Sequence, residues 1–316
     1  MCGRIGVAAV VVVLALQVTE PELLARVAVP LALAGIVLGV PHGAVDHMVP
    51  FWTGGRRPDR VAMTRVLAGY LLVAAVAAAC LVLAPAPTVL AFLAVSAGHF
   101  GRAEVTAAAE RAGRPVPGGA TDLAPALAHG LAVVVLPVAL WPAESAVVLG
   151  WLSPALGNPL PAGARAVLGL LVAGLTVLAV VGLLRRHRAR EAAELALVVA
   201  LFVVVPPLAA FGVYFAGWHA VRHTGRLLGL PGPDGVVPGP AAGVRRLALH
   251  AALPTAVSLA AVLVLVGPAT TPAAVSGALA VLVALTFPHV RTVAALDRWS
   301  ADRPVDPSGW LTSKDG

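Results

Sequence analysis

The sequence predicts an all-α protein, a bundle of about ten helices (eight to ten) that crosses a lipid bilayer. Of its 316 residues, 59% are apolar and 12% are charged, whereas soluble domains are about 45–50% apolar and about 25% charged. Apolar runs of bilayer-spanning length, about 20 residues, recur along the chain. The basic residues, which give a net charge of +7, lie between these runs, as in the cytoplasmic loops of membrane proteins. This distribution excludes a soluble or disordered chain and argues against a nucleic-acid partner.

Most of the predicted spans are uninterrupted runs. Those of full length are residues 23–40, 61–84, 120–142, 163–184, 244–266 and 272–294. The run 87–104 is shorter and ends in a polar segment around His99. Residues 5–19 are as short as the apolar part of a signal peptide, but no small-residue cleavage site precedes Glu20. We therefore expect 5–19 to be retained as the first span.

The stretch 192–229 contains Pro206 and Pro207, which together disfavour one continuous helix. It forms either one kinked span or two spans, 192–205 and 207–229. The loops rich in basic residues are 56–65, 102–114, 185–190, 222–246 and 291–303. Two spans place all of these loops on the cytoplasmic side, as the positive-inside tendency expects. We therefore expect ten helices with both termini in the cytoplasm.

The chain reads as one integral membrane domain, residues 1–316, in the cell membrane. Its last residues, 299–316, are charged or rich in Gly and Pro and are expected to form a cytoplasmic tail. Cys2 and Cys80 are too few for a disulfide framework or a thiolate metal site. The function must therefore lie within the bilayer.

Nine histidines are the most informative polar residues, because polar groups inside a span are costly and indicate function. His187 lies in an arginine-rich loop, where a solvated side chain is expected, and His129 and His250 are isolated and read as structural or interfacial. The other six lie in four short segments that contain His42 and His47, His99, His219 and His223, and His289.

With ten spans, the helices that carry these segments all run from outside to inside. Each histidine lies toward the inner end of its helix, so five of them are expected at a similar depth: His42, His99, His219, His223 and His289. Several neutral imidazoles in a low-dielectric bundle suit a transition-metal ion such as iron, zinc, copper or nickel. We therefore predict a shared metal site in the inner leaflet.

Spacing adds detail to this site. His219 and His223 are four residues apart, which places both on one face of a helix. Asp46 is four residues after His42 and is expected to orient it, as buried carboxylates often orient ligating histidines; the alternative is a solvated carboxylate at the membrane surface. His42 and His47 are five apart, about 140° around a helix, so both are not expected to bind one ion.

Other catalytic motifs are missing from the sequence. It contains no His-Glu-x-x-His, no Gly-x-Ser-x-Gly and no Walker or dinucleotide-binding loop. A transporter is expected to show matched broken segments in two halves of the chain, and only 192–229 is broken here. A non-catalytic carrier or metal permease that uses the same histidines is the alternative to an enzyme.

Four segments in this order resemble the bacterial Brp/Blh family of β-carotene 15,15′-dioxygenases. They are the Gly-x-Pro-His-Gly-Ala-x-Asp-His run that ends at His47, His99-Phe100-Gly101, Trp218-His219-x-x-Arg222-His223, and Pro288-His289. They extend over residues 38–290, most of the chain. Glu104 stands where an aspartate is expected in the family, and Ala220 stands where a serine is commoner.

The resemblance implies a non-haem Fe(II) enzyme that uses O2 to split the central double bond of β-carotene into two molecules of all-trans-retinal. It implies four iron ligands, which are His42, His99, His219 and His223. Further residues are expected around the metal or in the substrate pocket: Asp46, His47, Glu104, Tyr214, Trp218, Arg222 and His289. The retinal product could supply an opsin-type protein.

Overall fold

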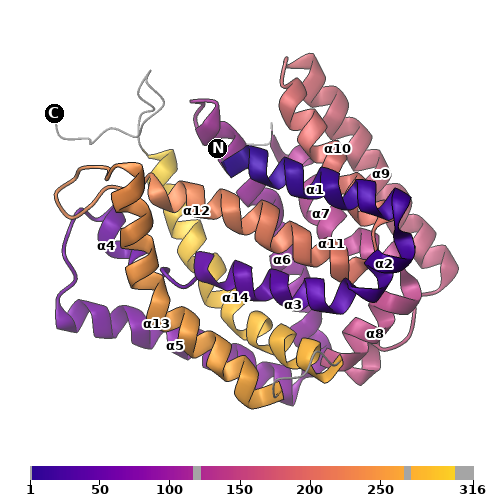
Figure 1. Ribbon diagram of the computed structural model, residues 1–316, viewed down its shortest axis with the longest axis horizontal. Coiled ribbons are helices and arrows are strands. Elements are labelled where there is room, and N and C mark those ends of the chain that lie inside the picture. The colour runs from indigo at the N-terminus through magenta and orange to yellow at the C-terminus, as the bar shows by residue number, and fades with distance from the viewer. Residues whose placement is uncertain (1, 117–121, 267–271, 303–316) are drawn as a thin grey trace.

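The computed structural model describes residues 2–116, 122–266 and 272–302, and in these ranges the chain is helical and contains no strand. The longer helices (Figure 1) are α1 (Cys2–Thr19), α3 (Ala28–Gly39), α5 (Arg60–Leu83), α6 (Pro85–Arg111), α7 (Leu123–Leu140), α8 (Pro142–Leu152), α9 (Ala162–Arg185), α10 (Ala189–Val204), α13 (Pro240–Val266) and α14 (Pro272–Ala301). The shorter ones are α2 (Pro21–Arg26), η1 (Val40–His42), α4 (Val49–Thr53), η3 (Pro154–Leu156), α11 (Pro207–Val213), the π-helix η4 (Tyr214–Ala220) and α12 (Val221–Leu228).

The all-α prediction is confirmed, and each predicted span coincides with a helix or a run of helices. Five helices are long and apolar enough to cross a membrane, and these are α5, α7, α9, α13 and α14. The other candidate segments are shorter or interrupted, or carry more charge, so length and hydropathy do not confirm ten spans. The expected tail begins inside α14, which extends to Ala301, and residues 303–316 lie outside the described residues.

The helix break predicted at the two prolines is present. Helix α10 ends at Val204, Val205 is extended, and α11 begins at Pro207. The stretch 207–229 is not one regular helix, because the π-helix η4 separates α11 from α12. Helix α8 was not predicted, since the connection 143–162 has few residues that distinguish a short helix from a loop.

Helices that pack closely do so at glycines. A Cβ at Gly101 of α6 would collide with the backbone carbonyl of Ala126 in α7, and a Cβ at Gly35 of α3 would collide with the backbone of Gly212 in α11. Small residues at such contacts let helix backbones approach closely in membranes. These contacts hold α6 and the α11–η4–α12 run, which carry three of the clustered histidines.

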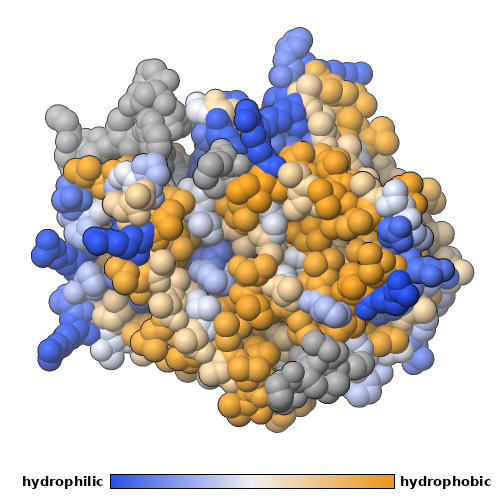
Figure 2. Space-filling model, in the orientation of Figure 1, coloured by the Kyte–Doolittle hydropathy of each residue, from blue (hydrophilic) through white to orange (hydrophobic). Residues whose placement is uncertain are grey.

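One end of the bundle holds many of its ion pairs. Arg111 at the end of α6 pairs with Glu194 of α10 at 2.8 Å, and Arg226 of α12 pairs with Glu110 of α6 and Asp297 of α14, both at 2.8 Å. The start of α1 and the end of α14 lie at this same end (Figure 1). Figure 2 shows a broad band of apolar side chains over the middle of the visible face, with hydrophilic side chains toward its edges. The surface is that of a membrane protein.

Candidate metal centre

Five buried imidazole rings gather at one place in the bundle. The ring centroid of His42 lies 5.2 Å from that of His219, 5.5 Å from that of His223 and 4.9 Å from that of His289. The ring of His99 lies 4.9 Å from that of His219 and 5.0 Å from that of His289. The structure thus brings together the five histidines that the sequence places at one depth, here called the histidine cluster.

Each ring reaches the cluster from a different position in the fold. His42 ends the short 3₁₀-helix η1, which begins at Val40 where α3 stops, with Pro41 next in the chain. His99 lies within α6, His219 in the π-helix η4 and His223 in α12. His289 follows Pro288 inside α14. Single-turn π-helical segments are rare and frequent at functional sites.

Four ring nitrogens of the histidine cluster lack a hydrogen-bond partner in the described part of the chain. Nε2 of His42, Nε2 of His289 and both ring nitrogens of His223 are buried and have no hydrogen-bond partner among the described residues. Nε2 of His99 and Nε2 of His219 lie 3.2 Å apart. Buried polar atoms without partners are costly and rare. Several unpartnered imidazole nitrogens at one point fit a transition-metal ion, which this ligand type binds well.

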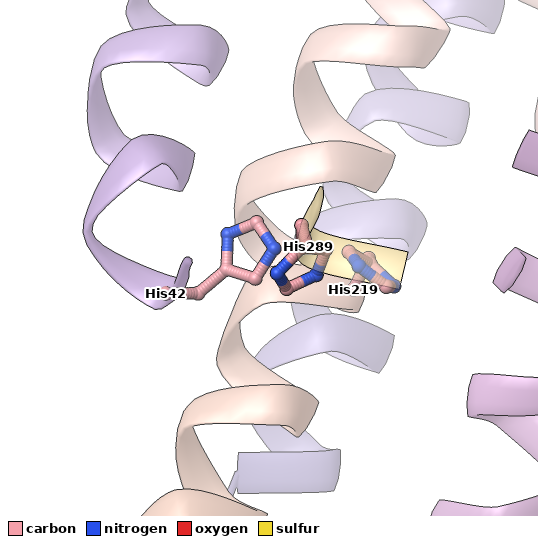
Figure 3. A group of neighbouring side chains, drawn as sticks. All are labelled: His42, His219 and His289. Atoms are coloured by element: carbon pink, nitrogen blue, oxygen red, sulfur yellow. The ribbon is translucent and has the colours of Figure 1, made fainter. Parts of the chain in front are cut away.

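Three of these rings satisfy a direct geometric test for metal binding. Ligand atoms of His42, His219 and His289 all lie within 4.8 Å of one another, and all three residues are buried (Figure 3). His289 was expected only near the metal or in the pocket. The structure therefore adds His289 to the candidate ligands, whereas His99 and His223, which the resemblance implies as ligands, lie in the histidine cluster but outside this group of three.

Hydrogen bonds at the outer nitrogens orient two of the rings. Nδ1 of His42 lies 2.5 Å from the carbonyl oxygen of Gly39, and Nδ1 of His289 lies 2.8 Å from Oδ2 of Asp46. The expectation that Asp46 orients His42 is therefore wrong. The α-helix gives way to η1 at Val40 and then to a turn, so the four-residue spacing no longer places Asp46 beside His42.

Tyr70 is a site residue that sequence reasoning missed. Its hydroxyl donates to Oδ2 of Asp46 at 3.1 Å, from the neighbouring helix α5. A tyrosine among the apolar residues of a membrane helix is a weak signal, because tyrosines also anchor helices at the interface. Its partner lies 24 residues earlier in the chain, a separation that local patterns cannot reveal.

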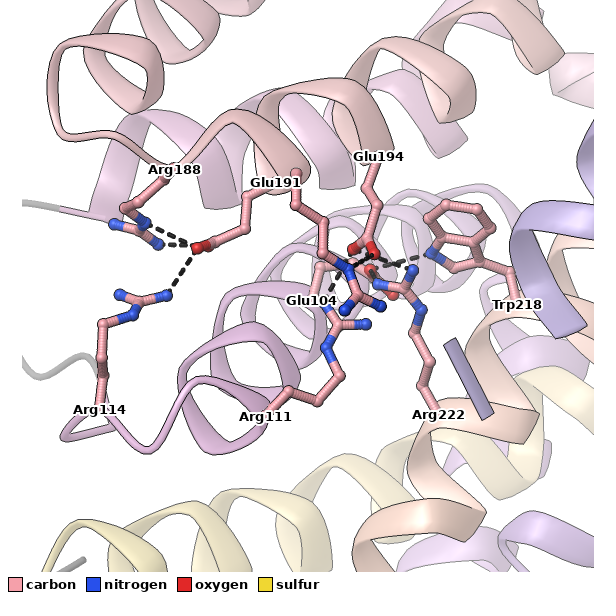
Figure 4. Close-up of polar contacts among 9 residues, drawn as sticks. Glu104, Arg111, Arg114, Arg188, Glu191, Glu194, Trp218 and Arg222 are labelled. Carbon is pink, nitrogen blue, oxygen red and sulfur yellow. Dashed lines mark hydrogen bonds and ion pairs between the residues drawn. The ribbon is translucent and has the colours of Figure 1, made fainter. Parts of the chain in front are cut away.

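A second polar cluster supports the π-helix. Oε2 of Glu104 accepts hydrogen bonds from Nε1 of Trp218 at 2.9 Å and from Arg222 at 2.5 Å. The Arg222 guanidinium also pairs with Glu194 at 3.0 Å and lies 3.9 Å from the centroid of the Trp218 ring. Figure 4 shows these side chains meeting between α6, α10 and α12. Glu104, Trp218 and Arg222, which were expected near the metal or pocket, hold the backbone that carries His219 and His223.

A neighbouring group of ion pairs lies in the segments that connect the helices. Arg188, before α10, donates to Glu191 at 2.5 Å and to Asp122, and Arg114 pairs with Glu191 at 2.7 Å (Figure 4). The hydrogen bond to Glu191, followed by the one to Asp122, raises the pKa of Arg188 above its ordinary value despite partial burial. These contacts join the starts of α7 and α10 to the segment that follows α6.

The remaining predicted residues lie around the cluster but outside it. Nδ1 of His47 is 3.1 Å from the carbonyl oxygen of Ala44, and its ring lies 6.4 Å from that of His250. Tyr214 is buried against Phe100, with ring centroids 5.4 Å apart. His187 is exposed in its loop, as expected.

A predominantly apolar cavity of about 430 Å³ adjoins the histidine cluster. His42, His99, His219 and His289 are part of its wall, together with Asp46, His47 and Tyr70. Its apolar walls come from α5, α6, α7, α8, α11, α13 and α14. Phe100 and Phe215 line the cavity. Tyr214 and Trp218, which were expected around the metal or in the pocket, do not line it, and neither does Phe287. The arrangement combines a group of side chains that could hold a metal ion with an apolar cavity.

A family model described as beta-carotene 15,15'-dioxygenase matches residues 33–297, a range that contains the whole histidine cluster. The chain belongs to this family. A protein of Halobacterium salinarum named "Probable beta-carotene 15,15'-dioxygenase Blh" is 31% identical over 299 residues, which cover 85% of this chain and 84% of that protein. No solved structure matches the chain. The resemblance inferred from the four motifs is thereby confirmed, and membership of the family supports an oxygenase that cleaves carotene.

Proposed function

We propose that this protein is an Fe(II)-dependent dioxygenase that cleaves β-carotene at its central 15,15′ double bond and releases two molecules of all-trans-retinal. One observation carries the proposal: unpartnered, buried imidazole nitrogens converge on the wall of an apolar cavity. Imidazole ligands are suited to iron, and the cavity walls are suited to a hydrocarbon. Neither feature alone would distinguish this function from a structural or transport role.

His42, His99, His219 and His223 are the proposed iron ligands. Iron held there would supply the one-electron chemistry that lets O2 react with the closed-shell polyene. The protein's own contribution is to hold these rings neutral, buried and oriented, since the carbonyl of Gly39 fixes His42 and the Glu104–Arg222–Trp218 contacts fix the helix of His219 and His223.

The reaction requires little acid–base chemistry from the chain. One carbon–carbon double bond breaks, two carbon–oxygen double bonds form, and both atoms of O2 are used, so no proton or leaving group is released. The site matches this balance. The carboxylate that touches the histidine cluster, Asp46, is engaged by His289 and Tyr70, and Glu104 is engaged by Trp218 and Arg222.

The cavity walls bind and align the substrate. A symmetric polyene must extend on both sides of its central bond, and the lining comes from α5 and α13 as well as from α7, α8 and α11. The low polarity of these walls also excludes bulk water from the reacting bond. The description of the family model, beta-carotene 15,15'-dioxygenase, supports central rather than terminal cleavage.

We also propose ten membrane crossings in the cell membrane, with both termini cytoplasmic. The arginine-rich ends of α6, α9, α10 and α12 lie at one end of the bundle, where positive charge favours the cytoplasm. The proposal of an opsin-type protein as acceptor of retinal rests on the product alone.

The test combines loss of carotenoid colour with metal analysis. In carotenoid-producing bacterial cells, expression of the protein should turn the cells pale as retinal accumulates, and the purified protein should contain iron. His219→Ala and His223→Ala should abolish both, whereas His187→Ala, in an exposed loop, should change neither. Full iron content without colour loss in the wild type would favour the metal carrier, and full iron and turnover in His219→Ala would overturn the site.

A further inference from the structure

A buried carboxylate touches the histidine cluster. Asp46 is 2% exposed. Oδ2 of Asp46 accepts from Tyr70 at 3.1 Å and lies 2.8 Å from Nδ1 of His289, and Oδ1 is buried without a hydrogen-bond partner. Among the described residues, no arginine or lysine forms an ion pair with it. An ionised carboxylate buried in this way is costly unless a positive charge lies nearby.

His289 connects this carboxylate to the other rings. Its Nδ1 faces Asp46, while its Nε2 is buried and has no hydrogen-bond partner in the described part of the chain. The ring lies 4.9 Å from that of His42, 5.0 Å from that of His99 and 5.4 Å from that of His223. A hydrogen bond from Nδ1 to a carboxylate fixes the tautomer that leaves the Nε2 lone pair free, which is the usual arrangement behind a metal-ligating histidine.

The local backbone allows the close approach of Asp46 and His289. Gly43 lies between the segment of His42 and Asp46, and a Cβ there would come within 3.3 Å of Nδ1 of His289 and 3.8 Å of Oδ2 of Asp46. The first of these contacts is tight enough to require a shift of the ring. Gly43 therefore leaves room for the ring in the position that points Nε2 toward His42 and His219.

We infer that His289 is a fifth imidazole ligand of the metal, positioned by Asp46 and Tyr70. The inference rests on the proposed iron centre and extends its four-histidine ligand set. It accounts for the unpartnered Nε2 of His289, which would bind the metal. It also accounts for the buried carboxylate of Asp46, because its negative charge would then lie one imidazole away from a divalent cation. The other explanation is that His289 only pairs with Asp46 and binds no metal. A metal probe distinguishes the two, because only a ligating His289 contributes to the coordination of the bound ion.

Co(II) is the probe, because its visible absorption reports the number of its ligands. Purified, metal-free protein is titrated with Co(II), and the affinity, stoichiometry and spectrum are compared between variants. His289→Ala and His289→Gln should each change the spectrum and weaken binding, and added imidazole should restore the wild-type spectrum of His289→Ala. Asp46→Asn should weaken Co(II) binding by roughly 10- to 100-fold, and Tyr70→Phe by less than Asp46→Asn.

His250→Ala is the matched control, since this ring contacts His47 and Trp52 rather than the cluster. It should leave the Co(II) spectrum unchanged. If the wild type binds Co(II) and both His289 variants give its spectrum and affinity, the inference is overturned while the metal centre stands. If the wild type binds no Co(II) at the cluster, the proposed function itself fails. His289→Gln retains side-chain volume and guards against a variant that merely fails to fold.

Discussion

Nε1 of Trp218 donates a hydrogen bond of 2.9 Å to Oε2 of Glu104, joining the π-helix to α6. Trp218 is adjacent to His219, and Glu104 lies five residues after His99 in α6. The same carboxylate oxygen accepts from Arg222, which precedes His223. One buried carboxylate therefore sets the relative position of three of the histidines in the cluster.

We predict that Glu104→Ala destabilises the protein and empties the metal site. Removing this carboxylate leaves the buried Nε1 of Trp218 without its acceptor and leaves Arg222 with Glu194 as its remaining carboxylate partner, and an unsatisfied buried donor typically costs about 1–3 kcal/mol. Thermal denaturation in detergent should show a midpoint lower by several degrees, and metal analysis should show lost iron. The matched control is Arg190→Ala, since this side chain is 63% exposed and pairs with Glu194, a contact expected to contribute under about 1 kcal/mol. Equal midpoints for both variants would contradict the role given to Glu104.

A second prediction concerns two glycines three residues apart in α6. Gly101→Ala should reduce stability and activity, because its Cβ would collide with the backbone of Ala126 and push α6 away from α7. Overpacking of this kind commonly costs about 1–3 kcal/mol. Gly98→Ala should be tolerated, since nothing lies within 4 Å of the added Cβ. Retinal formation measures the activity of the two variants, and thermal midpoints measure their stability. A loss of activity and stability in Gly98→Ala, with none in Gly101→Ala, would refute this packing.

The fold could be predicted where composition and charge act over whole segments. The lengths of the apolar runs located the helices. The distribution of arginines favoured a break at Pro206 and Pro207, and the structure has this break between α10 and α11. The π-helix at 214–220 could not be predicted, because its residues are also normal in an α-helix. Trp218 in this helix and Arg222 just after it bind Glu104, more than 100 residues earlier in the chain, a tertiary contact that local sequence patterns do not reveal.

The site could be predicted as a set of residues but not as a set of contacts. Depth along helices that run in the same direction was enough to group His42, His99, His219, His223 and His289. The partners at their outer nitrogens were not predictable, because they depend on how η1 turns after α3. His289 and Asp46 lie 243 residues apart in the chain, and no local spacing relates them.

The proposed topology predicts which loops face the cytoplasm. With ten crossings, a fluorescent protein fused after the C-terminus should fluoresce, and alkaline phosphatase fused within the loop at Gly157 should be active. The reason is that Gly157 follows α8, at the end of the bundle opposite the arginine-rich ends of α9 and α10. Phosphatase fused at His187 should be inactive, and activity there together with inactivity at Gly157 would reverse the orientation.

The last prediction concerns how the hydrocarbon reaches the cavity. Leu71 of α5 and Val257 of α13 both line the cavity, yet they are 61% and 60% exposed. Helices α5 and α13 each pack on α14 and, among the described residues, scarcely contact one another. Because a carotene dissolves in the bilayer, we predict that it enters laterally between these helices. Val257→Trp should then slow cleavage of β-carotene supplied in liposomes by several-fold without changing bound iron.

Leu253→Trp separates a blocked entrance from a general effect of a large side chain on α13. Leu253 lies one turn earlier, is 73% exposed and does not line the cavity, so its replacement should leave the cleavage rate near that of the wild type. If both variants cleave β-carotene at the wild-type rate, the substrate enters elsewhere. If both are slower than the wild type to the same extent, the added tryptophan disturbs α13 itself. A slow Val257→Trp beside a normal Leu253→Trp would assign entry to the side of the cavity formed by α5 and α13, because Val257 lines the cavity and Leu253, one turn away on α13, does not.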